Sequence, residues 1–189
     1  MSRHLASAGL LSVWMVGAPI GALAATPAAM HSKLRELEIS AGHWVYHGQF
    51  LAGHQARQPW TWNEHCRWSD NRVFMLCSFS NEWAGRHVNS VVVDTYDPQH
   101  HTFWHYELFN SGSAAGKPFA SRMRIAGPTR TESWTETHAG KVVRQRIVYH
   151  FTSATSVTVE FQSATHGAHW QTTASGTGHK VGPAGSPGH

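Results

Sequence analysis

Charged residues are scarce in this sequence, and they are not clustered. Lys, Arg, Asp and Glu make up 14% of the 189 residues, and the formal net charge is +4. A nucleic-acid surface usually carries a clustered basic patch, whereas the lysines and arginines here are scattered. We therefore expect no nucleic-acid partner. The sequence also lacks an HExxH motif, so it predicts no metal site. A nucleophile elbow and a phosphate-binding glycine loop are missing too, which makes an enzyme the less favoured alternative.

Long apolar runs are missing except at the N-terminus. The stretch from Leu5 to Ala22 is mostly apolar, follows a short basic start, and leads into the small-x-small sequence that ends at Ala24. This pattern predicts a signal peptide over residues 1–24; an uncleaved anchor is the alternative. No later run approaches the ~20 residues that span a bilayer. We expect a periplasmic or secreted protein that has no membrane partner after cleavage.

Cysteine is also rare, with only Cys66 and Cys77. An oxidising compartment favours their pairing. The residues between them predict a strand, a turn and a second strand. A two-residue loop at Asp70 and Asn71 would leave the cysteines diagonal to each other, ~7–8 Å apart, which is long for a disulfide. A shifted register or a bulge would bring them together, so a disulfide and a pair of buried thiols both remain open.

Aromatic residues are plentiful, and the sequence contains nine Trp. Together with many Gly, Ser and Thr residues, this composition favours sheets and turns. Residues 31–41 have helical spacing, and the pattern after them changes to period two. We expect ten strands, near residues 43–51, 58–68, 73–80, 87–96, 102–109, 118–126, 129–138, 141–151, 156–164 and 168–174.

This strand spacing predicts an all-β fold, an up-and-down antiparallel barrel of about ten strands with a short N-terminal helix. A sandwich is the structural alternative. The barrel domain would cover residues 25–175. Residues 176–189 are rich in Gly and Pro, so we expect them to form a flexible tail.

The register of two expected strands can be derived from their apolar residues. A three-residue loop at 153–155 places Ile147, Tyr149 and Phe151 opposite Phe161, Val159 and Val157, with the polar residues on the other face. The same face of the strand near 141–151 places Val143 and Gln145 inside the barrel. Extending the register to the preceding strand puts Glu132, Trp134 and Glu136 beside them. A buried carboxylate is costly unless it is paired or hydrogen-bonded. The two glutamates therefore indicate an open barrel mouth or a polar ligand site.

The start of the first expected strand resembles the lipocalin and calycin barrels. A Gly-x-Trp sequence, here Gly42 and Trp44, follows the short helical stretch. In such folds the Trp closes one barrel end under the helix, and the Gly allows a tight turn into the strand. The resemblance assigns these structural roles to Gly42 and Trp44.

A wider set of segments resembles the bacterial domain-of-unknown-function 1579 family over roughly residues 33–175. The segments occur in the order associated with that family: LRELEISAGHW, WNEHCRW, NRVFMLCSF, VDTYDPQHHTF and SATHGAHW. One departure is His166-Gly167, where an Asp-Gly turn would be expected. The resemblance implies a lipocalin-like barrel of about this size and transfers no activity.

A barrel of this size has an interior for one small ligand. We therefore expect an exported protein that binds a small apolar or amphipathic molecule, with aromatic side chains as contact area and Glu132, Glu136 or Gln145 at a polar end. The expected ligand-binding residues are Trp60, Trp62, Trp104, Tyr106, Glu132, Trp134, Glu136, Gln145 and Tyr149. One alternative is an enzyme that uses Glu132 or Glu136 as a general base. Another is a structural module whose barrel is filled by its own side chains.

Sixteen histidines raise the question of a metal or haem. His101 and His105 are four residues apart on one strand, ~13 Å, which is too far to share one ion. The sequence therefore predicts no metal and no cofactor. Similar ten-stranded barrels include nitrobindin-like haem proteins, an analogy at the level of the fold. If this barrel bound haem, His169 at the start of the last strand would be the preferred ligand.

Overall fold

The computed structural model describes residues 27–51, 57–83, 86–110, 115–138, 140–165 and 169–182. The expected signal peptide and residues 183–189 lie outside the described residues. The chain begins with helix α1 (Pro27–Leu34), which continues as the 3-10 helix η1 (Arg35–Ser40). Neither helix is long and apolar enough to cross a membrane.

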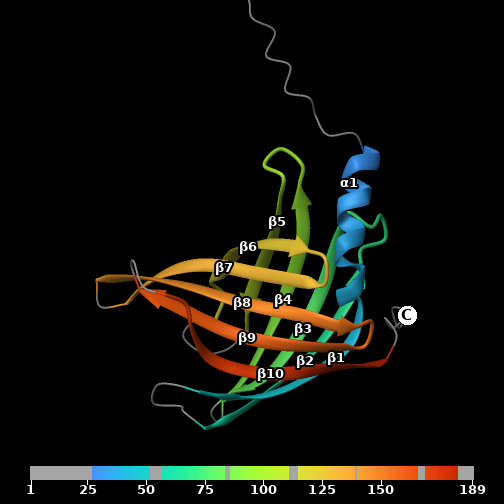
Figure 1. Cartoon of the computed structure of the whole chain (residues 1–189). Coiled ribbons are helices and arrows are strands. Elements are labelled where there is room, and N and C mark those ends of the chain that lie inside the picture. The colour runs from blue at the N-terminus through green and yellow to red at the C-terminus, as the bar shows by residue number, and fades with distance from the viewer. Residues whose placement is uncertain are drawn as a thin grey trace, which may run out of the picture.

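Ten antiparallel strands form one closed barrel, each paired with its neighbours in the chain and β1 paired with β10 (Figure 1). This arrangement confirms the expected all-β up-and-down barrel with a short N-terminal helix. The strands are β1 (Gly42–Phe50), β2 (Pro59–Trp68), β3 (Phe74–Trp83), β4 (Arg86–Asp97), β5 (Thr102–Phe109), β6 (Pro118–Ala126), β7 (Thr129–His138), β8 (Lys141–Ser153), β9 (Ser156–Thr165) and β10 (Gln171–Gly182).

The β8–β9 register agrees with the one derived from the sequence. Ile147, Tyr149 and Phe151 pair with Phe161, Val159 and Val157. These side chains are buried or half-buried, whereas residues between them, such as His150 and Thr158, are exposed. A slip of one residue would turn the apolar set towards solvent, so the hydrophobic pattern determines this register.

The helices mark one end of the barrel, which we call the helix end. Because the strands alternate in direction, the β2–β3, β4–β5, β6–β7 and β8–β9 connections lie at this end, and the other connections lie at the far end. Trp44 is fully buried and belongs to the same core cluster as Leu34 and Leu37 of the helices. Gly42 has φ +117°, a conformation that only glycine adopts easily. The conformation of Gly42 and the burial of Trp44 agree with the roles that the resemblance implies for them.

The expected tail was wrong at its start, because β10 continues to Gly182. Two of the glycines of β10, Gly176 and Gly178, are required by packing. A Cβ added to Gly176 would lie 2.6 Å from the Trp60 ring, and one added to Gly178 would lie 2.4 Å from the Tyr46 ring. Glycines that suggest a loose tail in the sequence therefore make room for large aromatic side chains inside the barrel.

The two cysteines form a disulfide across β2 and β3. Cys66 pairs directly with Cys77, and their Cα atoms are 4.0 Å apart. The loop between the strands is longer than two residues: Trp68 pairs with Met75, and the Ser69 amide donates to the Phe74 carbonyl oxygen at 2.9 Å. The longer loop provides the register shift that a disulfide requires.

Candidate functional site

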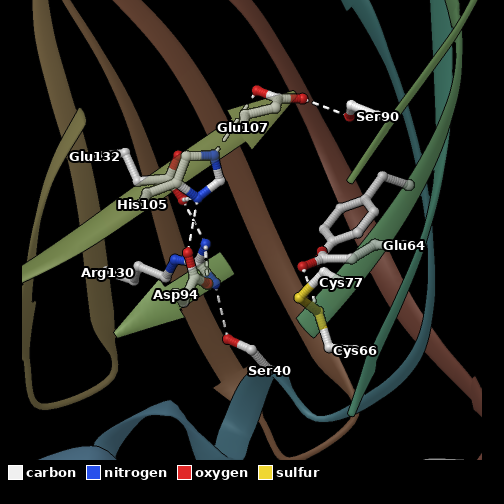
Figure 2. A network of polar contacts seen from close by, with 11 residues as sticks. Ser40, Glu64, Cys66, Cys77, Ser90, Asp94, His105, Glu107, Arg130 and Glu132 are labelled. Carbon is white, nitrogen blue, oxygen red and sulfur yellow. Dashed lines mark hydrogen bonds and ion pairs between the residues drawn. A yellow bond between two sulfur atoms is a disulfide. The ribbon is translucent and has the colours of Figure 1, made fainter. Parts of the chain in front are cut away.

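A layer of buried charged side chains lies inside the barrel, in the half next to the helix end. Asp94 on β4, His105 on β5, and Arg130 and Glu132 on β7 are each at most 4% exposed. They come from three strands whose alternation turns every second residue inward. Figure 2 shows the four side chains converging between the strands.

Two cations connect the carboxylates of this layer. His105 Nδ1 donates to Asp94 Oδ1 at 2.8 Å. Arg130 donates to Glu132 Oε1 at 2.5 Å and to the Ser40 hydroxyl of η1 at 2.9 Å, and it lies 3.3 Å from Asp94 Oδ2. The layer is thus linked to the helix end through Ser40.

The carboxylates determine the charge of His105. Burial alone lowers the pKa of a histidine, but the nearby carboxylates of Glu132 and Asp94 outweigh it and raise the pKa of His105 well above its ordinary value. Burial alone would raise the pKa of Asp94. The positive charges of Arg130 and His105 outweigh burial, so the pKa of Asp94 is lowered. The two carboxylates thus favour the protonated, imidazolium form of His105.

Glu64 on β2 lies beside this layer and behaves differently. Burial raises its pKa to about 7, an effect partly offset by the charge of Arg130 and a hydrogen bond from Tyr46. The Tyr46 hydroxyl donates to Glu64 Oε2 at 2.7 Å, and Oε1 lies 3.0 Å from the Cys66 sulfur (Figure 2). A disulfide sulfur has no proton to donate, so a proton on Glu64 makes this contact favourable.

Glu64, Cys66 and Cys77 also place their ligand atoms within 4.8 Å of one another. The disulfide uses both sulfur atoms, so this group is not a metal site.

A cavity of about 350 Å³ extends from the charged layer. Its size lies at the lower end of the range for small-molecule sites. Asn81, Glu107 and Glu136 lie towards the far end of the barrel, judged from their positions along β3, β5 and β7. The described lining residues are mostly aromatic, with a few polar groups: Trp62, Phe79, Asn81, His105, Glu107, Phe109, Phe119, Glu132, Trp134, Glu136, Ile147, Tyr149 and Phe161.

Five of the nine residues expected at a ligand site line this cavity: Trp62, Glu132, Trp134, Glu136 and Tyr149. Trp60 is inside the barrel and buried, with its ring centroid 5.3 Å from that of Trp62, but it is not among the lining residues. The two expected glutamates have partners. Glu132 accepts from Arg130, and Glu136 accepts from Trp134 Nε1 at 2.6 Å.

The orientation expected for β5 was wrong. Trp104 is half-buried and Tyr106 is 44% exposed, whereas His105 is buried and lines the cavity. Phe103 and Phe109 share the inward face with His105, so β5 carries aromatic residues on both faces. Its two faces differ little in hydrophobicity, and the bonds of His105 to the charged layer determine which one turns inward.

Trp104 and Gln145 instead line a second, more open hollow. It lies where β6 and β7 separate, because their pairing covers only Arg122↔Ser133 to Ala126↔Thr129. Phe119, Trp134 and Glu136 line both this hollow and the inner cavity. The two spaces are therefore neighbours across the splayed strands.

His169 does not have the position of an internal haem ligand. It is exposed, precedes β10, and is not a described lining residue of the cavity. The histidine that does line the cavity, His105, has its Nδ1 hydrogen-bonded to Asp94.

Sequence reasoning found Glu132 but missed the other three residues at the centre of the site, Asp94, His105 and Arg130. Asp94 directly follows the apolar run Val91-Val92-Val93 within the expected strand, and a charged residue at that place was the available signal. Arg130 and Glu132 are two residues apart on β7 and thus share a face. Asp94 and His105 are direct partners in the β4–β5 register, and Arg130 and Glu132 reach them from β7, on the far side of β6.

The barrel is similar to a solved structure of a distant sequence. The crystal structure of Rv2717c from M. tuberculosis superposes with a TM-score of 0.53 at 11% sequence identity, covering 82% of this chain and 98% of that one. No protein-family model and no curated protein matches the sequence. The resemblance to the domain-of-unknown-function 1579 family thus stays a prediction, and the chain is shown to be a lipocalin-like barrel with an aromatic-rich interior.

Proposed function

We propose that this protein is an exported carrier or receptor for one small apolar or amphipathic molecule, held inside the barrel. The observation that carries the proposal is the cavity of about 350 Å³, lined by aromatic rings and ending on fixed polar groups. Aromatic side chains provide large contact areas at low entropic cost, which suits the binding of a small ring-containing molecule.

The polar end of the site is held in place before a ligand arrives. His105 is fixed by Asp94, Glu132 by Arg130, and Glu107 accepts from the Ser90 hydroxyl at 2.5 Å. Such preorganisation lowers the entropic cost of binding. The apolar end and the preorganised polar end together favour an amphipathic ligand.

Export is supported by the leader-like N-terminal sequence and by the disulfide. Structural disulfides are typical of periplasmic and secreted proteins. The enzyme alternative has less support, because Glu132 and Glu136 both already accept hydrogen bonds within the barrel. The cavity of about 350 Å³ likewise gives a module filled by its own side chains less support than a binding protein.

Native mass spectrometry of the protein purified from a bacterial periplasm tests the proposal. We expect extra mass that is lost on denaturation, or, from an empty barrel, saturable binding of a naphthalene probe followed by tryptophan fluorescence. Two probes are used, 1-naphthylmethanol and 1-naphthylmethylamine. A bare chain that binds neither probe would contradict the proposal.

A matched pair of variants shows whether binding takes place in the cavity. Ile147→Trp adds bulk to a lining residue and should abolish binding of both probes. Leu108→Trp adds an indole at a position that is 53% exposed and should leave binding unchanged. Equal loss in both variants would place the probe outside the cavity.

A further inference from the structure

The inner cavity contains an excess of negative charge. Three glutamates line it, Glu107, Glu132 and Glu136, and the only described basic group in its lining is His105. Arg130, behind the wall, pairs with Glu132 and Asp94. Glu136 also borders the second hollow, which Arg122 and Arg144 line, and is left out of the count. Three carboxylates, Asp94, Glu107 and Glu132, thus face two cations, His105 and Arg130, and Glu64 adds a fourth carboxyl group when it ionises.

Burial makes this excess expensive. A carboxylate removed from water needs a positive partner or several hydrogen bonds. Glu107 lies 3.8 Å from His105 Nε2, too far for a good hydrogen bond, and His105 already donates to Asp94. A positively charged group in the cavity would therefore lower the electrostatic free energy of the folded protein.

The other lining groups also suit a cation that donates hydrogen bonds. Asn81 Oδ1 is buried in the cavity wall and has no hydrogen-bond partner among the described residues. The rings of Trp62, Trp134 and other lining aromatics attract cations through their faces. Cages of aromatic side chains with nearby carboxylates are a general solution for binding organic ammonium groups.

We propose that the cavity selects an organic cation, a compact apolar molecule that carries one ammonium group. The ammonium group would lie against Glu107 and Asn81, and the apolar part against the aromatic rings. This inference rests on the proposed binding function and specifies its ligand class. A volume of about 350 Å³ equals roughly a dozen water molecules, so the ligand would have about a dozen non-hydrogen atoms.

Three naphthalene probes of the same shape test the charge preference by calorimetric titration at pH 7.5. They are 1-naphthylmethylamine, which is cationic, 1-naphthylmethanol, which is neutral, and 1-naphthoic acid, which is anionic. We expect the amine to bind at least tenfold more tightly than the alcohol, and the acid to bind more weakly than both.

A variant that removes one negative charge from the cavity provides a second test of the charge preference. Glu107→Gln should weaken amine binding about tenfold and leave alcohol binding within twofold. Glu82→Gln is the matched control, because Glu82 is exposed on β3. Circular dichroism shows whether each variant is folded. If Glu107→Gln does not fold, the titrations of wild type with the three probes still test the charge preference.

The outcomes separate this inference from the proposed function. Equal binding of amine and alcohol, or tighter binding of the acid, would overturn the cation preference and leave a small-molecule carrier. An equal loss of amine and alcohol binding in Glu107→Gln would also overturn it. Absence of binding by all three probes would overturn the cation preference together with the proposed function.

Discussion

At the scale of single residues, Glu64 should make the stability of the fold depend on pH. It is 2% exposed, and burial raises its pKa from 4.5 to about 7. As the pH rises above 4.5, the unfolded chain releases this proton, whereas the folded chain keeps it until about pH 7. The folded state therefore binds more protons in this range, so the free energy of unfolding falls as the pH rises.

Replacing this carboxyl group by an amide should remove that pH dependence. Wild type should lose up to about 3 kcal/mol between pH 5 and pH 8 through Glu64, since one pKa unit corresponds to about 1.4 kcal/mol. Glu64→Gln keeps an acceptor for the Tyr46 hydroxyl and cannot ionise. We expect its stability, measured by urea unfolding at pH 5, 6.5 and 8, to decline less than that of wild type.

His105 does not affect the comparison of Glu64→Gln with wild type, because both proteins contain it. The raised pKa of His105 stabilises the folded protein, and this stabilisation is lost as the pH rises through the pKa of His105 in the folded state. The loss adds the same pH dependence to the free energy of unfolding of wild type and of Glu64→Gln. Glu160→Gln on the exposed side of β9 is the control and should follow wild type. Parallel pH curves for Glu64→Gln and wild type would show that Glu64 is ionised in the folded protein across this range.

At the scale of single elements, the sequence predicts a strand well when its two faces differ. On β8 and β9 one face is apolar and the other polar, and the derived register is confirmed. On β5 both faces carry aromatic residues, so the pattern did not show that His105 rather than Trp104 turns inward. The difference came from long-range contacts with Asp94, which local periodicity does not contain.

The last strand shows a second limit of local patterns. Glycine is unfavourable in strands and is typical of turns, so residues 176–182 resembled a tail. In the barrel, Trp60 and Tyr46 occupy the space beside Gly176 and Gly178. The requirement for glycine comes from side chains more than 100 positions away in the sequence.

Gly176→Ala tests this explanation of β10. The new methyl group would lie 2.4 Å from the His47 carbonyl oxygen and 2.6 Å from the Trp60 ring, so one of these must move. We expect a loss of about 1–3 kcal/mol in the free energy of unfolding and a change in tryptophan fluorescence. Gly182→Ala, which has no atom within 4 Å of its added methyl group, should be neutral. Similar stabilities for the two variants would refute the packing role of Gly176.

At the scale of the whole molecule, closure of the barrel determines the site. The charged layer needs β4, β5 and β7 on one side and the helix end at Ser40 on the other, and the ring of strands holds them together. The ring closes through the pairing of β10 with β1 and β9. Loss of this closure would open both neighbouring strands and expose the interior to water.

Two truncated chains test how much of the C-terminus is needed for closure. A chain that ends at residue 175 keeps the pairs Phe50↔Ala174 and Gln49↔Ser175 but loses the pairs from Gly48↔Gly176 to His43↔Gly182. The first half of β1, which includes Trp44, would then lie at an open sheet edge, and such edges promote aggregation. We expect this chain to lose its near-ultraviolet circular dichroism or to lose more than about 4 kcal/mol of stability.

A chain that ends at residue 182 retains every pair between β10 and its neighbours. It should match the full-length mature protein in thermal unfolding and in binding of the naphthalene probes. If the chain ending at residue 175 folded equally well, residues 176–182 would not be needed to close the barrel. The cavity would then depend on nine strands and the first part of β10. The flexible tail would begin at residue 176, as the sequence predicts.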